Sequence, residues 1–149
     1  MSETPVTVRE ARAGDAPALA VLMTELGYPT RERRAAERLS GLLAGADDVV
    51  FVAAMGGAVV GFVHAAERRL LVSDRFVEME ALIVTAGARR HGAAADLVAA
   101  VEGWSRARGV AELRVRARVE RAAAHRFYRG RGFALAKQQR LFVKRLGPP

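Results

Sequence analysis

A chain of 149 residues that is 51% apolar and 27% charged is long enough to bury the core of one soluble domain without covalent crosslinks. It contains no cysteine, which excludes disulfides, thiolate metal sites and a cysteine acyl-enzyme. The net charge of +8 comes almost entirely from arginine, so a polyanion is an expected partner, either a nucleic acid or a cofactor with several phosphates.

The sequence gives no sign of a membrane segment or of a metal site. No apolar run approaches the roughly 20 residues that span a bilayer, and residues 1–5 lack the basic and apolar regions of a signal peptide. The histidines, at 64, 91 and 125, are far apart and have no ligand spacing. We therefore expect one cytoplasmic domain over residues 1–149, with no metal and no membrane association.

The N-terminal third predicts a strand followed by two helices. Residues 5–10 alternate between apolar and polar, as a half-buried strand does. Asp15 is expected to cap a first helix, which Gly27 stops. Thr30 is expected to cap a second helix that ends near Gly45.

The middle of the chain predicts a hairpin. Residues 49–55 and 58–65 are apolar, β-branched runs, and Gly56-Gly57 between them is typical of a two-residue hairpin turn. The charged residues 66–75 either extend this hairpin or form a loop, and the sequence leaves both open.

The rest of the chain predicts two helices among four strands. Apolar residues at i, i+3, i+4 spacing predict a long helix from Arg89 to about Arg108, which Gly109 ends. The other expected elements are strands at 77–84, 111–117, 133–136 and 140–144, and a short helix at about 121–129. The expected fold is a mixed α/β sheet of about six to seven strands with four helices on both faces.

A basic turn with a glycine follows the apolar strand at 81–84. Its sequence is Arg89-Arg90-His91-Gly92-Ala93-Ala94. A strand, a turn and a helix start in this order present free backbone N–H groups to a phosphate. The glycine lets the backbone approach a ligand, the two alanines keep side chains away, and the two arginines add positive charge. The alternative is a glycine in the first turn of an ordinary helix.

The order of these motifs resembles the GNAT superfamily of acetyl-CoA-dependent N-acetyltransferases. That family has an apolar strand, then Arg/Gln-x-x-Gly-x-Gly/Ala at a helix start, then a strand, then a short helix that ends in a Tyr and a Gly-Phe. The matching segments here are 82–84, 89–94, 113–115 and 124–133. The resemblance covers nearly the whole chain, since the N-terminal strand, helix pair and hairpin follow the same order.

The resemblance implies a site for coenzyme A. The turn at 89–94 would hold the pyrophosphate, and Leu82, Ile83 and Val84 would hydrogen-bond the pantetheine arm where their strand splays from the 111–117 strand. Arg121 stands where the family commonly has an asparagine that contacts the pantetheine, so this chain departs from the pattern there. Phe127 is expected to pack in the core. We also expect Phe127 and Arg121 to border the bound coenzyme.

Three residues are candidates for proton transfer. The resemblance implies that Tyr128 protonates the leaving thiolate, and its alternative is a packed tyrosine with a satisfied hydroxyl. Glu78 and Glu80 share one face of their strand by the period of two, and a positioned carboxylate can take the proton of an amine. Glu78 matches the base of several protein-lysine acetylating relatives and Glu80 a glutamate frequent in small-molecule ones. The alternative is that both are surface charges.

These observations predict direct transfer of an acetyl group from acetyl-CoA to a primary amine of a small molecule. The alternatives are an acyl-CoA-binding regulatory module without turnover, a protein lysine or N-terminal acetyltransferase, and a basic nucleic-acid-binding domain. An aromatic content of 6% argues against the last, because such surfaces stack bases on aromatic rings. No motif specifies the acceptor, and a homodimer is an arrangement open to the chain.

Overall fold

The computed structural model describes residues 4–89, 91–117 and 119–148. Arg90, in the predicted phosphate-binding turn, therefore lies outside the described residues. The chain divides into two compact units, residues 1–116 and residues 117–149. Each unit is described by itself.

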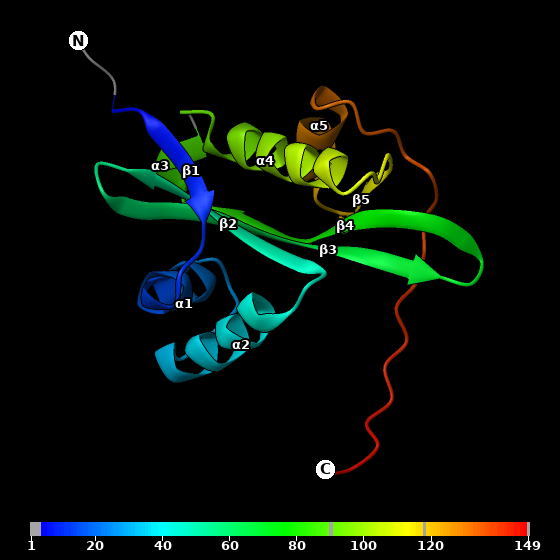
Figure 1. The fold of residues 1–149 in the computed structure, drawn as a ribbon, viewed down its shortest axis with the longest axis horizontal. Coiled ribbons are helices and arrows are strands. Elements are labelled where there is room, and N and C mark those ends of the chain that lie inside the picture. Colours follow the sequence, from blue (N-terminus) through cyan, green and yellow to red (C-terminus); the bar gives the residue numbers. More distant parts are fainter. Residues whose placement is uncertain (1–3, 90, 118, 149) are drawn as a thin grey trace. The chain divides into compact units, whose positions relative to one another are not determined.

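The first unit contains a mixed sheet with helices on both of its faces (Figure 1). Its strands are β1 (Val6–Glu10), β2 (Asp48–Met55), β3 (Ala58–Leu70), β4 (Ser73–Val84) and β5 (Leu113–Val115), and they lie in this order across the sheet. Its helices are the 3₁₀ helix η1 (Ala13–Asp15) and the α-helices α1 (Ala16–Glu25), α2 (Glu32–Ala44), α3 (Ala86–Arg89) and α4 (Ala93–Ala107). Neighbouring strands are antiparallel from β1 to β4, and β5 runs parallel to β4.

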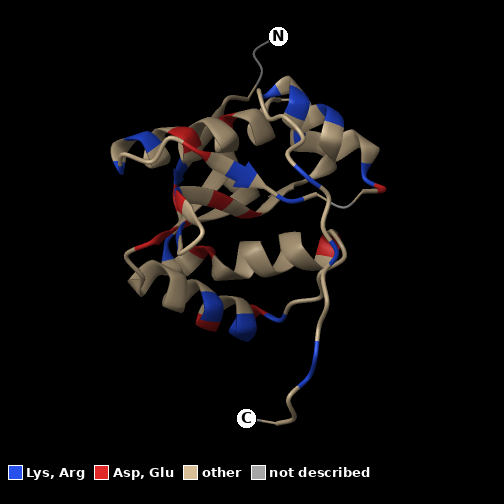
Figure 2. Ribbon diagram, turned by 90° about the vertical axis from the view of Figure 1, so that its right-hand side faces the viewer, with Lys and Arg blue, Asp and Glu red and all other residues tan. Residues whose placement is uncertain are grey.

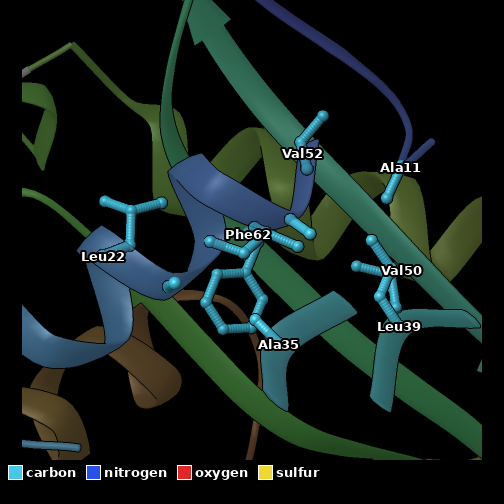
Figure 3. Close-up of a cluster of buried hydrophobic side chains, with 10 residues drawn as sticks. Ala11, Leu22, Ala35, Leu39, Val50, Val52 and Phe62 are labelled. Atoms are coloured by element: carbon cyan, nitrogen blue, oxygen red, sulfur yellow. The ribbon is translucent and has the colours of Figure 1, made fainter. Parts of the chain in front are cut away.

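The core of this unit lies on both faces of the sheet. On the face covered by α1 and α2, Val52 and Phe62 pack against helix residues such as Leu39 (Figure 3). On the opposite face, Leu97 and Val101 of α4 are fully buried. A fully buried side chain of this size contributes about 1.5–3 kcal/mol to stability. The alternation of strand side chains thus anchors a helical layer on each side.

The predicted hairpin is confirmed and is longer than its apolar runs. Gly56 and Gly57 have φ of +56° and +83°, as a tight turn that follows the right-handed twist of the strands requires. β3 continues to Leu70 and β4 begins at Ser73, so residues 66–75 extend the hairpin.

The predicted helix ends are confirmed, and Asp15 stands at the N-cap position of α1 as predicted. Gly45 is the C-cap of α2, and Gly109 follows α4 with a φ of +72°. The Asp15 carboxylate makes no capping hydrogen bond in α1; it accepts hydrogen bonds from the guanidinium of Arg9 and from the backbone N–H of Arg12.

The second helix begins one residue later than predicted. Its N-cap position is Arg31, whose side chain makes no capping hydrogen bond, and not Thr30. The Thr30 hydroxyl instead donates to the carbonyl of Tyr28 at 2.7 Å.

The second unit contains α5 (Ala122–Gly130), close to its predicted place. The predicted strands at 133–136 and 140–144 are wrong, because the described residues from 133 to 148 form no strand. Leu141 and Phe142 suit a strand, but a strand needs a hydrogen-bonded neighbour, and these side chains are 89% and 87% exposed. The described residues therefore hold five strands, not six to seven, and five α-helices, not four, while the mixed α/β class is confirmed.

Candidate active site

The predicted phosphate-binding turn is a break between two helices. The single helix expected from Arg89 is divided at Gly92, which has a φ of +77° and is the N-cap of α4. The first backbone bond of α4 runs from the N–H of Asp96 to the carbonyl of Gly92 at 3.0 Å. The N–H groups of the three alanines that precede Asp96 in the first turn therefore have no acceptor within the helix. They form a small, positively polarised surface that suits an anion.

Gly92 is required at this break by its backbone conformation. A Cβ placed on it would meet no atom within 4 Å, so neighbouring atoms leave room for a side chain. Its φ of +77° is a left-handed conformation that residues with a Cβ rarely adopt. Any side chain here would also stand in the open space at the N-terminus of α4.

The end of β4 has a backbone edge without a strand partner. Pairing with β5 covers only Val77, Glu78 and Met79, so residues 80–84 have no strand partner on that side among the described residues. Because the N–H of Thr85 donates to Val60 on β3, alternation turns the backbone groups of Leu82 and Val84 toward the open side.

The side chain of Arg89 links this open edge to the helix break. Its Nε donates to the carbonyl of Val84 at 3.2 Å. The backbone N–H of Val84 and both backbone groups of Leu82 stay directed to the open side. A strand edge with spare donors and acceptors thus leads directly into the N-terminus of α4.

β4 contains a β-bulge at Glu80. His64 of β3 pairs with Ala81, and the next residue, Ala65, pairs with Met79, so Glu80 is the extra residue on β4. Bulges often re-aim a side chain beside an active site. The sequence did not indicate this bulge, because it depends on the register between the two strands.

Both predicted carboxylates are paired with arginines. Glu78 accepts a hydrogen bond from Nε of Arg116 at 2.7 Å and lies 3.8 Å from Nε of Arg68. Glu80 accepts from Nε of Arg68 at 3.0 Å and also from its Nη2. The shared partner shows that the two carboxylates are on one side of the sheet, as predicted. The side chain of Glu78 is only 10% exposed, so the alternative of a surface charge is wrong for this residue.

A histidine and an aspartate extend this group. Nε2 of His64 on β3 lies 2.8 Å from Oδ1 of Asp48 on the neighbouring strand β2. The hydrogen bond to Glu80 raises the pKa of Arg68, and the charges of Glu78 and Asp48 raise it further. We call the following six residues the charged cluster: Asp48, His64, Arg68, Glu78, Glu80 and Arg116. In Figure 2 acidic and basic positions both appear on the strands.

Sequence reasoning named the two glutamates of the charged cluster as candidates for proton transfer but did not identify their arginine partners. Arg68 lies in the segment left open between hairpin and loop, and its approach to Glu80 follows from the hairpin register. A period-two pattern carried through residues 66–75 would have been the signal for it.

The second unit holds the predicted acid. The ring of Tyr128 packs edge-on against Phe127 and Phe133, with centroids 5.4 and 5.6 Å away. Burial raises the pKa of the Tyr128 phenol, while the charge of Arg121 at the N-cap of α5 opposes this shift. The phenol is therefore protonated at neutral pH, as an acid must be. Its approach to a bound thiol stays a prediction.

The described residues meet neither the requirements of a metal-binding group nor those of a membrane-spanning helix. No group of three or more acidic or histidine side chains in this part of the chain could hold a metal ion. No helix within the same residues is long and apolar enough to cross a membrane.

A comparison with known protein families finds a match over most of the chain. The family model described as acetyltransferase (GNAT) family matches residues 17–133. Aminoglycoside N-acetyltransferase AAC(6')-Iy, solved in complex with CoA, superposes with a TM-score of 0.88 at 21% identity, over 97% of each chain.

Two further solved structures are similar. The aminoglycoside 6'-N-acetyltransferase AAC(6')-Ih from Acinetobacter baumannii has a TM-score of 0.83 at 20% identity, over 95% of this chain and 99% of that one. A transcriptional regulator from Bacillus halodurans has a TM-score of 0.82 at 19% identity, over 93% and 99%. None of the curated proteins is a significant match to the chain. At these identities the structures establish the fold.

Proposed function

The chain belongs to the acetyltransferase (GNAT) family, and on this premise we propose that it acetylates a primary amine of a small molecule. As a member of that family it is an acetyl-CoA-dependent N-acetyltransferase, with acetyl-CoA as its co-substrate. The proposal concerns the acceptor and the roles of individual residues.

One observation carries the proposal for the coenzyme: the open edge of β4 leads into the open N-terminus of α4. The pyrophosphate would accept hydrogen bonds from the N–H groups at Gly92, Ala93 and Ala94, where the helix dipole favours negative charge. The pantetheine arm, which carries amide groups, would pair with the backbone of Leu82 as an added strand does, which leaves the N–H of Val84 for the acetyl oxygen. A solved relative with the same fold was crystallised with CoA, which supports this assignment.

Two proton transfers complete the reaction. The acceptor amine must lose a proton before it attacks, because free alkylamines are protonated at neutral pH. Glu80 is our candidate for the base, since it stands at the bulge and is 26% exposed, whereas Glu78 is more deeply buried between two arginines. The amine nitrogen forms a bond to the acetyl carbon, the developing oxyanion is held by the N–H of Val84, and Tyr128 gives its proton to the departing thiolate.

A small-molecule acceptor is supported by the structural neighbours. Several of them carry the word aminoglycoside in their names, and one was solved as a complex with a bisubstrate analogue of CoA and acetylneamine.

A screen of acetyl-CoA consumption tests the proposal. Amino acids, polyamines, aminoglycosides, lysine-containing peptides and N-terminal peptides would each be offered, with the N-acetylated product identified by mass. We expect turnover with at least one small amine. Turnover with peptides alone would reassign the acceptor to a protein, and coenzyme A binding without any turnover would favour the regulatory module.

A further inference from the structure

Arg68 lies at the centre of the charged cluster. It contacts Glu80 and Glu78, and the charge of Asp48 also acts on it. The cluster contains three carboxylates and two guanidiniums, so its charges nearly balance. A polycation would meet only a small excess of negative charge there, and it would also meet two arginines.

The strand that carries Arg68 is held in place from the other face of the sheet. The neighbouring Glu67 has a side chain that is 1% exposed and accepts hydrogen bonds from Arg108 at 2.8 Å, Arg75 at 3.0 Å and Arg69 at 3.3 Å. Since consecutive strand residues point to opposite faces, this anchor fixes the backbone without covering Arg68. The Arg68 side chain stays 47% exposed and is accessible to a ligand.

The guanidinium of Arg68 has donors to spare. Its Nε and Nη2 both donate to the same oxygen of Glu80. Its Nη1 has no hydrogen-bond partner within the described part of the chain. A planar guanidinium with one open edge is the side chain best suited to bind a carboxylate through two parallel bonds.

We propose that the acceptor is an amine that also carries a carboxylate, with Arg68 as the specificity-determining residue that binds this carboxylate. The inference rests on the proposed acetyl transfer and names its substrate class. Arg68 and Glu80 are in direct contact, so a ligand that reaches both has its amine and its carboxylate only a few bonds apart, as in an α- or β-amino acid. The ammonium of such a ligand faces Glu80 while its carboxylate takes the open edge of Arg68.

Matched substrates test the inference. Each of several α- and β-amino acids is compared with its own carboxamide, and kanamycin serves as the polycation. We expect kcat/KM for the acids to exceed that of the carboxamides by about 10- to 100-fold, as for a hydrogen bond to a charged group. Amidation makes an α-amino group less basic, with a pKa near about 8 in peptides. More of the carboxamide is therefore in the reactive form, so a preference for the acid does not arise from amine ionisation.

Two variants assign the preference to Arg68. Arg68→Gln is expected to remove the preference through KM, and Arg68→Lys to restore part of it as a point charge without the fork. Arg106→Gln is the control, because Arg106 is 75% exposed near the end of α4, far from the N-terminus of that helix. The inference would be overturned if the wild-type enzyme preferred carboxamides or kanamycin. It would also be overturned if Arg68→Gln kept the preference for the amino acids over their carboxamides.

Calorimetry separates this inference from the proposed function. With coenzyme A present, β-alanine and its carboxamide are titrated into the wild type and into Arg68→Gln. Selective binding of β-alanine by the wild type alone supports Arg68 even if no amine is acetylated, a result that would overturn only the proposed function. Equal binding of the two ligands overturns the inference even if acetylation is observed.

Discussion

Nε of Arg108, at the C-cap of α4, donates to Oε1 of Glu67 on β3 at 2.8 Å, although 41 positions separate the two residues. The same guanidinium donates through Nη2 to Asp47, just before β2, at 2.8 Å. One arginine therefore ties the end of the helix to the extended hairpin and to the start of the neighbouring strand. The hydrogen bond from Arg108, with those from Arg75 and Arg69, lowers the pKa of Glu67 from its ordinary value to about 2.

Glu67 is expected to make the fold acid-sensitive over a defined range of pH. Its pKa is lower in the folded protein than in the unfolded chain, so the unfolded chain binds the proton first as the pH falls. The stability that Glu67 contributes is therefore fully present above about pH 4.5 and is lost as the pH falls toward about 2. Glu67→Gln should lower the Tm at pH 7 and flatten its decline over this range, as measured by circular dichroism.

The control for this prediction is Glu102→Gln. Glu102 lies on the outer surface of α4 and pairs only loosely with Arg106 at 3.7 Å. Its removal should change the Tm by little, because exposed ion pairs contribute at most about 1 kcal/mol. Equal losses in the two variants would show that Glu67 does not hold the hairpin.

Gly92→Val should abolish binding of coenzyme A while the protein still folds. A β-branched residue at a φ of +77° costs about 1–3 kcal/mol in strain, and its side chain would occupy the place of the pyrophosphate. Gly27→Val is the matched control, because Gly27 has a φ of +95°, equally open surroundings and a position after α1. Calorimetry should show no coenzyme A binding in the first variant and ordinary binding in the second. Unchanged affinity in a folded Gly92→Val would remove the proposed phosphate site.

Gly61→Ala should destabilise the protein where the start of β3 pairs with the end of β4. A Cβ there would lie 2.9 Å from the carbonyl oxygen of Ile83 and 2.9 Å from Cγ2 of Val84. Relief of such contacts typically costs about 1–3 kcal/mol, and here it shifts the strand that we propose binds the pantetheine arm. Urea unfolding should show this loss, together with a higher KM for acetyl-CoA. Stability equal to that of Gly41→Ala, where a Cβ meets nothing within 4 Å, would contradict it.

Glu80→Gln should lower turnover at neutral pH by about 10²- to 10⁴-fold, the usual contribution of a general base. A rise in pH should restore part of the rate, since the amine then loses its proton without help. Glu78→Gln is the comparison, and a larger effect there would assign the base to Glu78. Rate profiles against pH that match the wild type in both variants would show that neither carboxylate takes the proton.

Local patterns predicted the fold class and most of the elements up to α5, because each of these has a short-range cause. The glycines at 56–57 and at 109 require left-handed backbone conformations, and the apolar spacing of α4 fits a single buried face. The two C-terminal strands were predicted from the apolar residues within 133–136 and 140–144, and propensity does not supply the partner that a strand needs. The divided helix at Gly92 was missed because Arg89 is as compatible with a short helix before the break as with the start of α4.

The candidate site was only partly accessible from the sequence. Glu78 and Glu80 are two residues apart in one strand, so the two-residue period of a strand predicted that they share a face. Arg68 lies twelve residues from Glu80 along the chain and meets it only through the hairpin register with its bulge. Long-range register is a property of the assembled sheet, which explains why the arginines of the charged cluster escaped prediction.

Tyr128→Phe should lower turnover by about 10²-fold with the affinity for acetyl-CoA nearly intact. A thiol has a pKa near roughly 8.5, so its thiolate leaves with modest help and the loss should be at the low end for an acid catalyst. Burial raises the pKa of the Tyr128 phenol, which keeps it protonated through the neutral range, where the reaction needs the proton. Stopped-flow release of coenzyme A, measured from pH 6 to 9, checks the effect.

The Tm of the same variant separates the acid from a merely packed tyrosine. The phenyl ring keeps both edge-on contacts, to Phe127 and Phe133, so a catalytic role predicts a Tm close to that of the wild type. If the hydroxyl instead serves the packing of the second unit, its loss leaves a buried partner unsatisfied, and the Tm falls while the folded protein turns over at the wild-type rate. Tyr28→Phe is the control for the substitution itself, because Tyr28 is 52% exposed and belongs to the first unit. Only a slow variant with an unchanged Tm is consistent with proton donation by Tyr128.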